Sequence, residues 1–330
     1  MTPVDENTRL LVKVAKLYYE NGLTQDAVAQ RLRISRPKVS RVLQEARDQG
    51  VVQITIAAVP GGHADLEREL ESRYDLMEAL VVDVTEPGSG AAVARELGQA
   101  AAAFFRRAVQ DGDVIGLTWG ATLAGMVDHL QPEKKQRVMV AQMVGGLGEP
   151  SSETHATDLA RRVSLALDAT LNLLPAPGIV NSVEVARLLR ADRHIAQSLE
   201  AASRSNIAFV GIGAPGAGSV LTRDESIISR EEVKRLVAMG AVGDIGLHFF
   251  DAAGGPILSD VEDRVIGVGL DVIRSLPRVV GIAGGTGKVA AVLGALRGKF
   301  INTLVTDVET ARRLLENAGA TAGEVPMVQP

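Results

Sequence analysis

Apolar side chains in the first sixty residues recur at three- and four-residue steps, which is the spacing of helices that bury one face. Residues 10–18 predict one amphipathic helix, and residues 24–42 predict two short helices joined by a tight turn. Residues 51–56 then alternate like a strand, so this part of the chain predicts a winged three-helix domain. The apolar face of the helix pair is made of Val28, Ala29, Leu32, Ile34, Val39, Val42, Leu43 and Ala46.

The second helix of the pair has a predicted start and a polar outward face. Ser35 can cap its first turn, and Pro37 lies where no helical N–H is lost. The arginine, lysine and serine side chains of this face suit phosphate oxygens and base edges in a DNA major groove. The alternative is an ordinary pair of helices with a solvated basic face. The residues predicted to contact DNA are Thr24, Gln25, Arg33, Ser35, Arg36, Pro37, Lys38, Ser40 and Arg41.

Arg33 occupies the turn position of this motif that is often glycine, because the backbone there is left-handed. A residue with a Cβ costs about 1 kcal/mol more than glycine in that conformation. The sequence therefore leaves open a turn of different shape.

Charge is divided unevenly along the chain. Residues 1–60 hold nine basic and six acidic side chains, a net charge of +3, and the total of −5 leaves −8 for the remainder. A basic head on an acidic body favours specific DNA contact by the head alone. The absence of cysteine excludes disulfides and cysteine-bound zinc, and the five histidines lack metal-ligand spacing. No metal, cofactor or catalytic residue is predicted.

At 330 residues the chain is long enough for two or three domains. Residues 57–62 contain a proline and two glycines between a predicted strand and a charged helix, which is typical of a linker. The sequence therefore predicts a helix-turn-helix domain over residues 1–59 and a second domain over residues 60–330. No signal-peptide pattern and no run of eighteen apolar residues occurs, so we expect a cytoplasmic protein without membrane contact.

Beyond the linker, short β-branched runs alternate with helical patterns. Strands separated by helices predict a doubly covered, mostly parallel α/β sheet. Ligands of such sheets bind at the carboxyl ends of the strands. The eight predicted strands are Ala79–Val84, Val114–Thr118, Arg137–Met143, Leu171–Leu174, Ile207–Ile212, Val265–Val268, Val279–Ile282 and Thr303–Thr306.

Three glycine-containing segments follow predicted strands: Gly116–Leu123, Gln142–Gly146 and Gly281–Lys288. Each could hold a phosphate on backbone N–H groups, and the alternative for each is a tight turn without a ligand. Lys288 adds a full positive charge in the first helical turn after its glycine loop, unless it is a solvated surface lysine. That loop is no P-loop, because Val289 replaces the serine or threonine that binds Mg²⁺.

A further polar group lies late in the chain. Asp244 and Asp251 flank His248, and Asp271 follows twenty residues later. These side chains could hold sugar hydroxyls or move protons, and the alternative is a set of ordinary turn and capping carboxylates.

Several of these blocks, in this order, resemble the SorC family of bacterial sugar-responsive transcriptional regulators. The resemblance covers nearly the whole chain. Members join an N-terminal helix-turn-helix to a large effector-binding domain. The blocks that carry the resemblance are Gly116–Leu123, Gln142–Gly146, Gly243–Ile245, Phe249–Asp251 and Ala283–Lys288.

The resemblance implies a large domain similar to the sugar-phosphate isomerase and CoA-transferase folds, a phosphorylated sugar or polyol as effector, and often a tetramer on a palindromic operator. It implies that the residues after the second strand meet the phosphate together with Lys288. One departure is Leu247–His248, where members often have Gly-Arg, so an arginine contact is missing or pH-dependent there. The effector-binding residues so implied are Gly120, Ala121, Thr122, Gln142, Gly145, Gly146, Asp244, His248, Asp271 and Lys288.

The sequence thus predicts a DNA-binding regulator, not an enzyme, whose affinity for a double-stranded operator is controlled by a phosphorylated sugar or polyol. A homo-oligomer, dimer or tetramer, is expected. The rival hypothesis is a sugar-phosphate isomerase or hydrolase with an accessory helical domain. A ligand-independent architectural DNA protein is disfavoured, because the large acidic domain would have no role in it.

Overall fold

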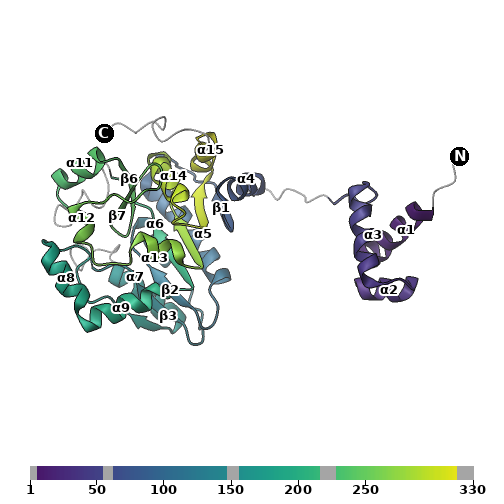
Figure 1. Cartoon of the computed structure of the whole chain (residues 1–330), viewed down its shortest axis with the longest axis horizontal. Helices are drawn as coiled ribbons and strands as arrows, with labels where there is room; N and C mark the ends of the chain where they lie inside the picture. The colour runs from purple at the N-terminus through teal and green to yellow at the C-terminus, as the bar shows by residue number, and fades with distance from the viewer. Residues whose placement is uncertain (1–5, 55–61, 147–155, 216–227, 318–330) are drawn as a thin grey trace. The chain divides into compact units, whose positions relative to one another are not determined.

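A computed structural model describes residues 6–54, 62–146, 156–215 and 228–317. Its contacts divide the chain into two compact units, Met1–Val59 and Pro60–Pro330. Both units are drawn in Figure 1, and each is described by itself below.

The first unit is a small helical bundle. Helix α1 (Glu6–Ala15) continues into one π-helical turn, η1 (Lys16–Glu20), and is followed by α2 (Gln25–Leu32) and α3 (Arg36–Asp48). The predicted apolar face is its core, in which Val28, Val39 and Ala46 are almost completely buried. The helix pair predicted from the spacing of apolar residues is confirmed.

The turn between α2 and α3 has the left-handed conformation that the motif requires. Arg33 has φ 53°, and the N–H of Ile34 donates to the Ala29 carbonyl across it at 3.0 Å. The Ser35 hydroxyl accepts from the Lys38 N–H at 3.4 Å and caps α3. The turn therefore has the usual shape of this motif in spite of the side chain at position 33, and the alternative shape is wrong.

The strand predicted over residues 51–56 is wrong for residues 51–54, which form no strand; residues 55 and 56 lie outside the described chain. The Val52 N–H donates to the Ala46 carbonyl at 2.9 Å, so the chain folds back over the end of α3. Val52 then packs against the helical core. An alternating pattern needs a second strand to pair with, and the described part of this unit offers none.

The second unit contains a parallel seven-stranded sheet of order β1-β9-β8-β5-β2-β3-β4. Two further strands, β6 (Ala241–Ile245) and β7 (His248–Asp251), form an antiparallel pair outside it. The mostly parallel sheet is confirmed. The strands of the sheet are β1 (Glu78–Val82), β2 (Val114–Leu117), β3 (Met139–Gln142), β4 (Thr170–Asn172), β5 (Ile207–Gly211), β8 (Arg278–Ile282) and β9 (Thr303–Asp307).

In the second unit one predicted strand is wrong and one pair of strands was missed. The apolar run Val265–Val268 is no strand, because it is bridged only singly, to Ile179 and through Gly267 to Val144. The pair β6 and β7 was not predicted, because glycine and aspartate interrupt the strand pattern there. Both segments lie near the carboxyl end of β3 or β5, since residue 144 follows β3 and Asp244 is bridged to Gly213 beyond β5.

Helices cover both faces of the sheet (Figure 1). Strand β5 shows why, because Ile207 and Phe209 face one core and Ala208 and Val210 face the other. The first core is closed by α5 (Gly90–Ala108), α6 (Ala121–Asp128) and α7 (Ala156–Leu167). The second is closed by α4 (Ala64–Tyr74), α9 (Arg193–Ser203), α13 (Leu270–Ser275), α14 (Val289–Arg297) and α15 (Val308–Glu316).

The remaining elements lie around the β6 and β7 pair and at the carboxyl edge of the sheet. They are α8 (Val183–Ala191), α11 (Arg230–Ala238), α12 (Asp260–Asp263) and the short 3₁₀ turn η2 (Thr286–Lys288). Among the described residues no helix is long and apolar enough to span a membrane.

The strand order contains one reversal of direction. From β2 the chain steps outward through β3 to β4, and from β5 it steps the opposite way through β8 to β9. Strands β2 and β5 are neighbours, so the crevice at their carboxyl ends is a topological switch point. Ligands of open α/β sheets bind at such points.

Candidate functional site

The outward face of α3 is exposed, as a DNA-reading helix requires. Of the predicted DNA contacts only Gln25 is half-buried, whereas Arg36, Lys38 and Arg41 are exposed, together with Thr24, Arg33, Ser35, Pro37 and Ser40. Arg36 Nε lies 3.6 Å from Asp26 Oδ1, and both side chains are 68 % exposed. Asp26 is a neighbour of this surface that sequence reasoning missed, because it belongs to the preceding helix.

The loops that follow β2, β5 and β8 are joined at the switch point. The Gly211 N–H, at the end of β5, donates to Thr118 Oγ1 at 3.1 Å. A Cβ at position 211 would lie 2.6 Å from the Trp119 carbonyl oxygen, so this close approach requires glycine. Thr122 Oγ1 donates to the Ile282 carbonyl at the end of β8, at 2.9 Å.

Lys288 and Asp244 both lie against the two residues that follow β5. Lys288 Nζ donates to the Ile212 carbonyl at 2.8 Å. Asp244 exchanges two backbone hydrogen bonds with Gly213, and a Cβ at position 213 would lie only 1.8 Å from Asp244 Oδ1. An ammonium group and a carboxylate therefore lie against the consecutive residues Ile212 and Gly213, although they are 44 residues apart in sequence.

Burial dominates the electrostatics of this pair. It raises the pKa of the Asp244 carboxyl, against the opposing charge of Lys288 and the N–H of Leu247, which donates to Oδ2 at 3.2 Å. It lowers the pKa of the Lys288 ammonium, against the opposing charge of Asp244. Asp244 Oδ1 is buried and has no hydrogen-bond partner among the described residues. The site thus holds a carboxylate oxygen that can still accept a hydrogen bond.

The predicted phosphate loop opens α6. Gly120 precedes the helix with φ 138°, a conformation that favours glycine, and a Cβ there would have no neighbour within 4 Å. Ala121 is exposed and Thr122 is half-buried in the first turn. The glycine loop before Lys288 is held by the last residue of β9, because the Gly285 N–H donates to Asp307 Oδ2 at 2.7 Å.

Three of the predicted effector residues are occupied by protein contacts. Gln142 is fully buried, and its Nε2 donates to the Val144 carbonyl at 2.7 Å. The N–H groups of Gly145 and Gly146 donate to the carbonyls of Ile266 and Ala176, at 2.9 Å each. The Gln142–Gly146 segment therefore supports the carboxyl edge of the sheet through hydrogen bonds within the protein.

The last two predicted residues, Asp271 and His248, also lie at the carboxyl edge of the sheet, on different elements. Asp271 is exposed in the first turn of α13, which begins at the carboxyl edge because it leads into the start of β8. His248 is 5 % exposed at the start of β7, and its Nδ1 is 2.8 Å from Glu262 Oε1. Sequence reasoning missed Glu262, because no local pattern links it to a histidine fourteen residues away.

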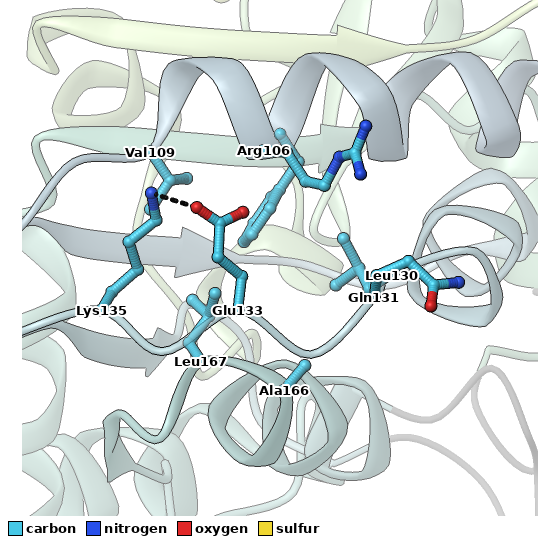
Figure 2. Close-up of a pocket in the computed structure, with 9 residues that line it drawn as sticks. Arg106, Val109, Leu130, Gln131, Glu133, Lys135, Ala166 and Leu167 are labelled. Atoms are coloured by element: carbon cyan, nitrogen blue, oxygen red, sulfur yellow. Dashed lines mark ion pairs between the residues drawn. The ribbon is translucent and has the colours of Figure 1, made fainter.

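A surface hollow in the second unit lies elsewhere (Figure 2). Lys135 Nζ and Glu133 Oε1 form an ion pair of 2.8 Å within it. Its lining residues Val109 and Leu167 precede β2 and β4, so the hollow is at the amino edge of the sheet. It is not part of the carboxyl-edge site. Among the described residues no cluster of three or more histidine or acidic side chains could hold a metal ion.

Comparisons with known proteins agree with this geometry. Residues 60–316 match the Sugar-bind family, described as "Putative sugar-binding domain". The Deoxyribonucleoside regulator of Bacillus subtilis (strain 168) is 35 % identical over 317 residues, covering 94 % of this chain and 99 % of the relative. The Sorbitol operon regulator of Klebsiella pneumoniae is 31 % identical over 320 residues, covering 94 % and 99 %. The crystal structure of that full-length regulator, SorC, gives a TM-score of 0.70 at 30 % identity and covers 94 % of this chain and 100 % of its own.

A helical head of this kind on a sugar-binding α/β unit is the architecture of a transcriptional regulator. The chain belongs to the SorC family of such regulators, as its sequence blocks predicted.

Proposed function

We propose that this protein is a one-component transcriptional regulator that releases or engages a double-stranded DNA operator when a phosphorylated sugar or polyol binds at the carboxyl edge of its sheet. The observation that carries the proposal is that Lys288 and the unpartnered Asp244 Oδ1 lie against consecutive residues, Ile212 and Gly213, at the switch point between β2 and β5. A cation and a free acceptor at that crevice match an anionic ligand that bears hydroxyls.

Two subsites follow from this geometry. The start of α6, at Gly120, Ala121 and Thr122, and the Lys288 ammonium receive the phosphate, because open backbone N–H groups and a cation both favour an anion. Asp244 and the exposed Asp271 accept from ligand hydroxyls. Gln142, Gly145 and Gly146 shape the floor of the site.

Residues 1–59 form the DNA-binding domain of this proposal, and residues 60–330 form the effector-binding and oligomerisation domain. The names of the Bacillus and Klebsiella relatives, a deoxyribonucleoside regulator and a sorbitol operon regulator, support a sugar-derived effector. A dimer or tetramer would present paired recognition helices to half-sites spaced by whole turns of DNA. To convert the protein almost completely between a DNA-bound and a DNA-free state, the effector must bind one of these states more tightly than the other by about 5.5 kcal/mol.

The protein acts without turnover in this proposal, and the rival is a sugar-phosphate isomerase or hydrolase. The test combines thermal unfolding, product analysis and gel-shift assays on genomic fragments. Ribose 5-phosphate, glucose 6-phosphate, fructose 6-phosphate and sorbitol 6-phosphate are the probes. We expect at least one to raise the melting temperature, to change operator affinity and to remain chemically intact. Product formation would favour the isomerase or hydrolase hypothesis. The absence of any preferred duplex would contradict the proposal that the protein is a DNA-binding regulator.

A further inference from the structure

Glu262 fixes the orientation of His248. Ser259 caps α12, its hydroxyl accepting from the Glu262 N–H at 3.3 Å, so this carboxylate is held at a defined place on the helix. Its Oε1 lies 2.8 Å from His248 Nδ1. A carboxylate can only accept, so the ring N–H at Nδ1 donates to it. In the neutral ring, Nε2 is then an unprotonated acceptor.

The Nε2 atom of His248 is left without a partner. It is buried and has no hydrogen bond to any described residue, in a side chain that is 6 % exposed. It lies beside Gly267, where a Cβ would be 3.5 Å away, and Gly267 is bridged to Val144 just beyond β3. The unpartnered nitrogen is therefore at the carboxyl edge of the sheet. A buried acceptor without a donor destabilises a protein, and such atoms call for an explanation.

A second unpartnered acceptor lies in the same two-stranded element. Asp244 Oδ1, at the end of β6, has no hydrogen-bond partner among the described residues. The two acceptors flank the tight turn Gly246–Leu247, which is held by the Leu247 N–H on Asp244 Oδ2. Hydroxyl groups are the donors that a sugar or polyol can bring to both.

We propose that His248 Nε2 accepts a hydrogen bond from a hydroxyl of the effector, a contact separate from that of Asp244, and that Glu262 is the positioning residue that orients this acceptor. The assignment rests on the proposed function and adds a specificity-determining pair to it. A ligand with a phosphate but without a suitably placed hydroxyl would leave Nε2 unsatisfied, so the pair selects for the polyhydroxylated part of the ligand.

The first experiment separates the hydroxyl contact from the phosphate contact. Dissociation constants are measured by calorimetry for the four sugar phosphates named above and for inorganic phosphate. We expect His248→Phe and Glu262→Leu each to weaken the sugar phosphate that binds best by about tenfold and to leave inorganic phosphate unchanged. The double variant should be no weaker than either single variant, because both remove the same contact. Asp263→Asn, an exposed carboxylate on the same helix, is the matched control and should change nothing.

A second measurement needs no substitution. Nitrogen-15 NMR of the histidine rings in the full-length wild-type protein should show His248 protonated at Nδ1, and adding the best-binding sugar phosphate should shift the Nε2 resonance while inorganic phosphate does not. The variant His248→Gln, which keeps an acceptor, should retain more affinity than His248→Phe.

The outcomes separate this proposal from the one on which it rests. If the wild type binds none of the four sugar phosphates, the proposed function is wrong, and so is the role proposed for His248 and Glu262, which are called the dyad here. If it binds them but the His248 and Glu262 variants bind equally well, or the Nε2 resonance does not respond, only the role of the dyad is overturned. Equal weakening of sugar phosphate and inorganic phosphate would make the dyad a structural support, which also overturns it.

Discussion

The charged residues that we propose to act in the two units lie in opposite surroundings. Arg36, Lys38 and Arg41 stand in water on α3, where the only ion pair described for them is the loose contact of Arg36 with Asp26. Asp244 and Lys288 lie against the protein interior, where burial penalises the charged form of each. A DNA-reading face can stay hydrated until phosphates replace its counterions. A small-ligand site gains from groups whose desolvation and orientation are already part of the folded state.

The strongest test of this contrast unfolds one unit and leaves the other. Val39 is completely buried in the helical unit, so Val39→Asp places an unpaired charge in its core at a cost of about 3–5 kcal/mol. We expect operator binding to disappear and the sugar-phosphate shift of the melting temperature to remain. Val12→Asp, at a 37 % exposed position of α1, is the matched control and should keep DNA binding. Loss of the ligand shift in the Val39 variant would show that the units do not act separately.

The next largest effect concerns the half-buried cation, Lys288. Lys288→Ala removes a charge-assisted contact to the phosphate, worth about 1.5–3 kcal/mol, and should raise the ligand concentration needed for a response by about ten- to a hundredfold. Operator affinity without ligand should not change. Lys234→Ala, an exposed lysine of α11, is the control. Gel shifts with and without the sugar phosphate measure both quantities, and DNA release by the Lys288 variant at the wild-type concentration would move the phosphate role to another residue.

The same contrast explains which features the sequence could predict. The helix-turn-helix depends on neighbours within about twenty residues, so its helices and the cap at Ser35 could be predicted from local chemistry. The left-handed turn at Arg33 could not, because the side chain at that position left the shape of the turn open. The sheet could be predicted because its strands are buried on both faces and therefore appear in the sequence as apolar runs. The same signal misled at Val265–Val268, which is buried and apolar but is bridged only singly.

The candidate site could be predicted from the sequence only in part. Asp244 and Lys288 could each be named from the blocks that carry the family resemblance, but their meeting at Ile212–Gly213 depends on the crossing from β5 to β8 and on an antiparallel bridge. Glu262 could not be found, because its partner is distant in sequence and α12 is a single turn. Tertiary contacts between separate elements leave no periodic signal.

On the DNA side the effects are smaller per residue, because each exposed group has only a share of the contact. Arg41→Ala and Arg36→Ala should each weaken binding to the preferred duplex by about 1–3 kcal/mol if they reach a base edge. Fluorescence anisotropy at fixed salt measures this, with Arg313→Ala in α15 as the control. If both variants bind like the wild type, α3 is not the recognition helix.

A pH dependence follows from the partial burial of Lys288. Burial lowers the pKa of Lys288 in the free protein, and a bound phosphate dianion favours the ammonium form and raises that pKa again. The complex therefore takes up a proton as it forms, and affinity should fall by up to about tenfold per pH unit as the pH rises between the two pKa values. Calorimetric titration above the second ionisation of the phosphate checks the slope. Lys288→Met should remove it, and a slope that survives would identify a different proton acceptor.

The smallest expected effect probes Asp26, the acidic residue that contacts Arg36 beside the proposed DNA-reading face. Asp26 repels phosphates and holds Arg36 through a 3.6 Å contact between two exposed side chains, a pair worth about 0.2–1 kcal/mol. Asp26→Asn should raise the affinity for unrelated duplexes a few-fold and so lower the ratio of specific to non-specific binding. Asp48→Asn, at the far end of α3, changes the net charge equally and should have a weaker effect. Equal effects of the two substitutions would mean that only net charge matters, and that the contact between Asp26 and Arg36 does not tune recognition.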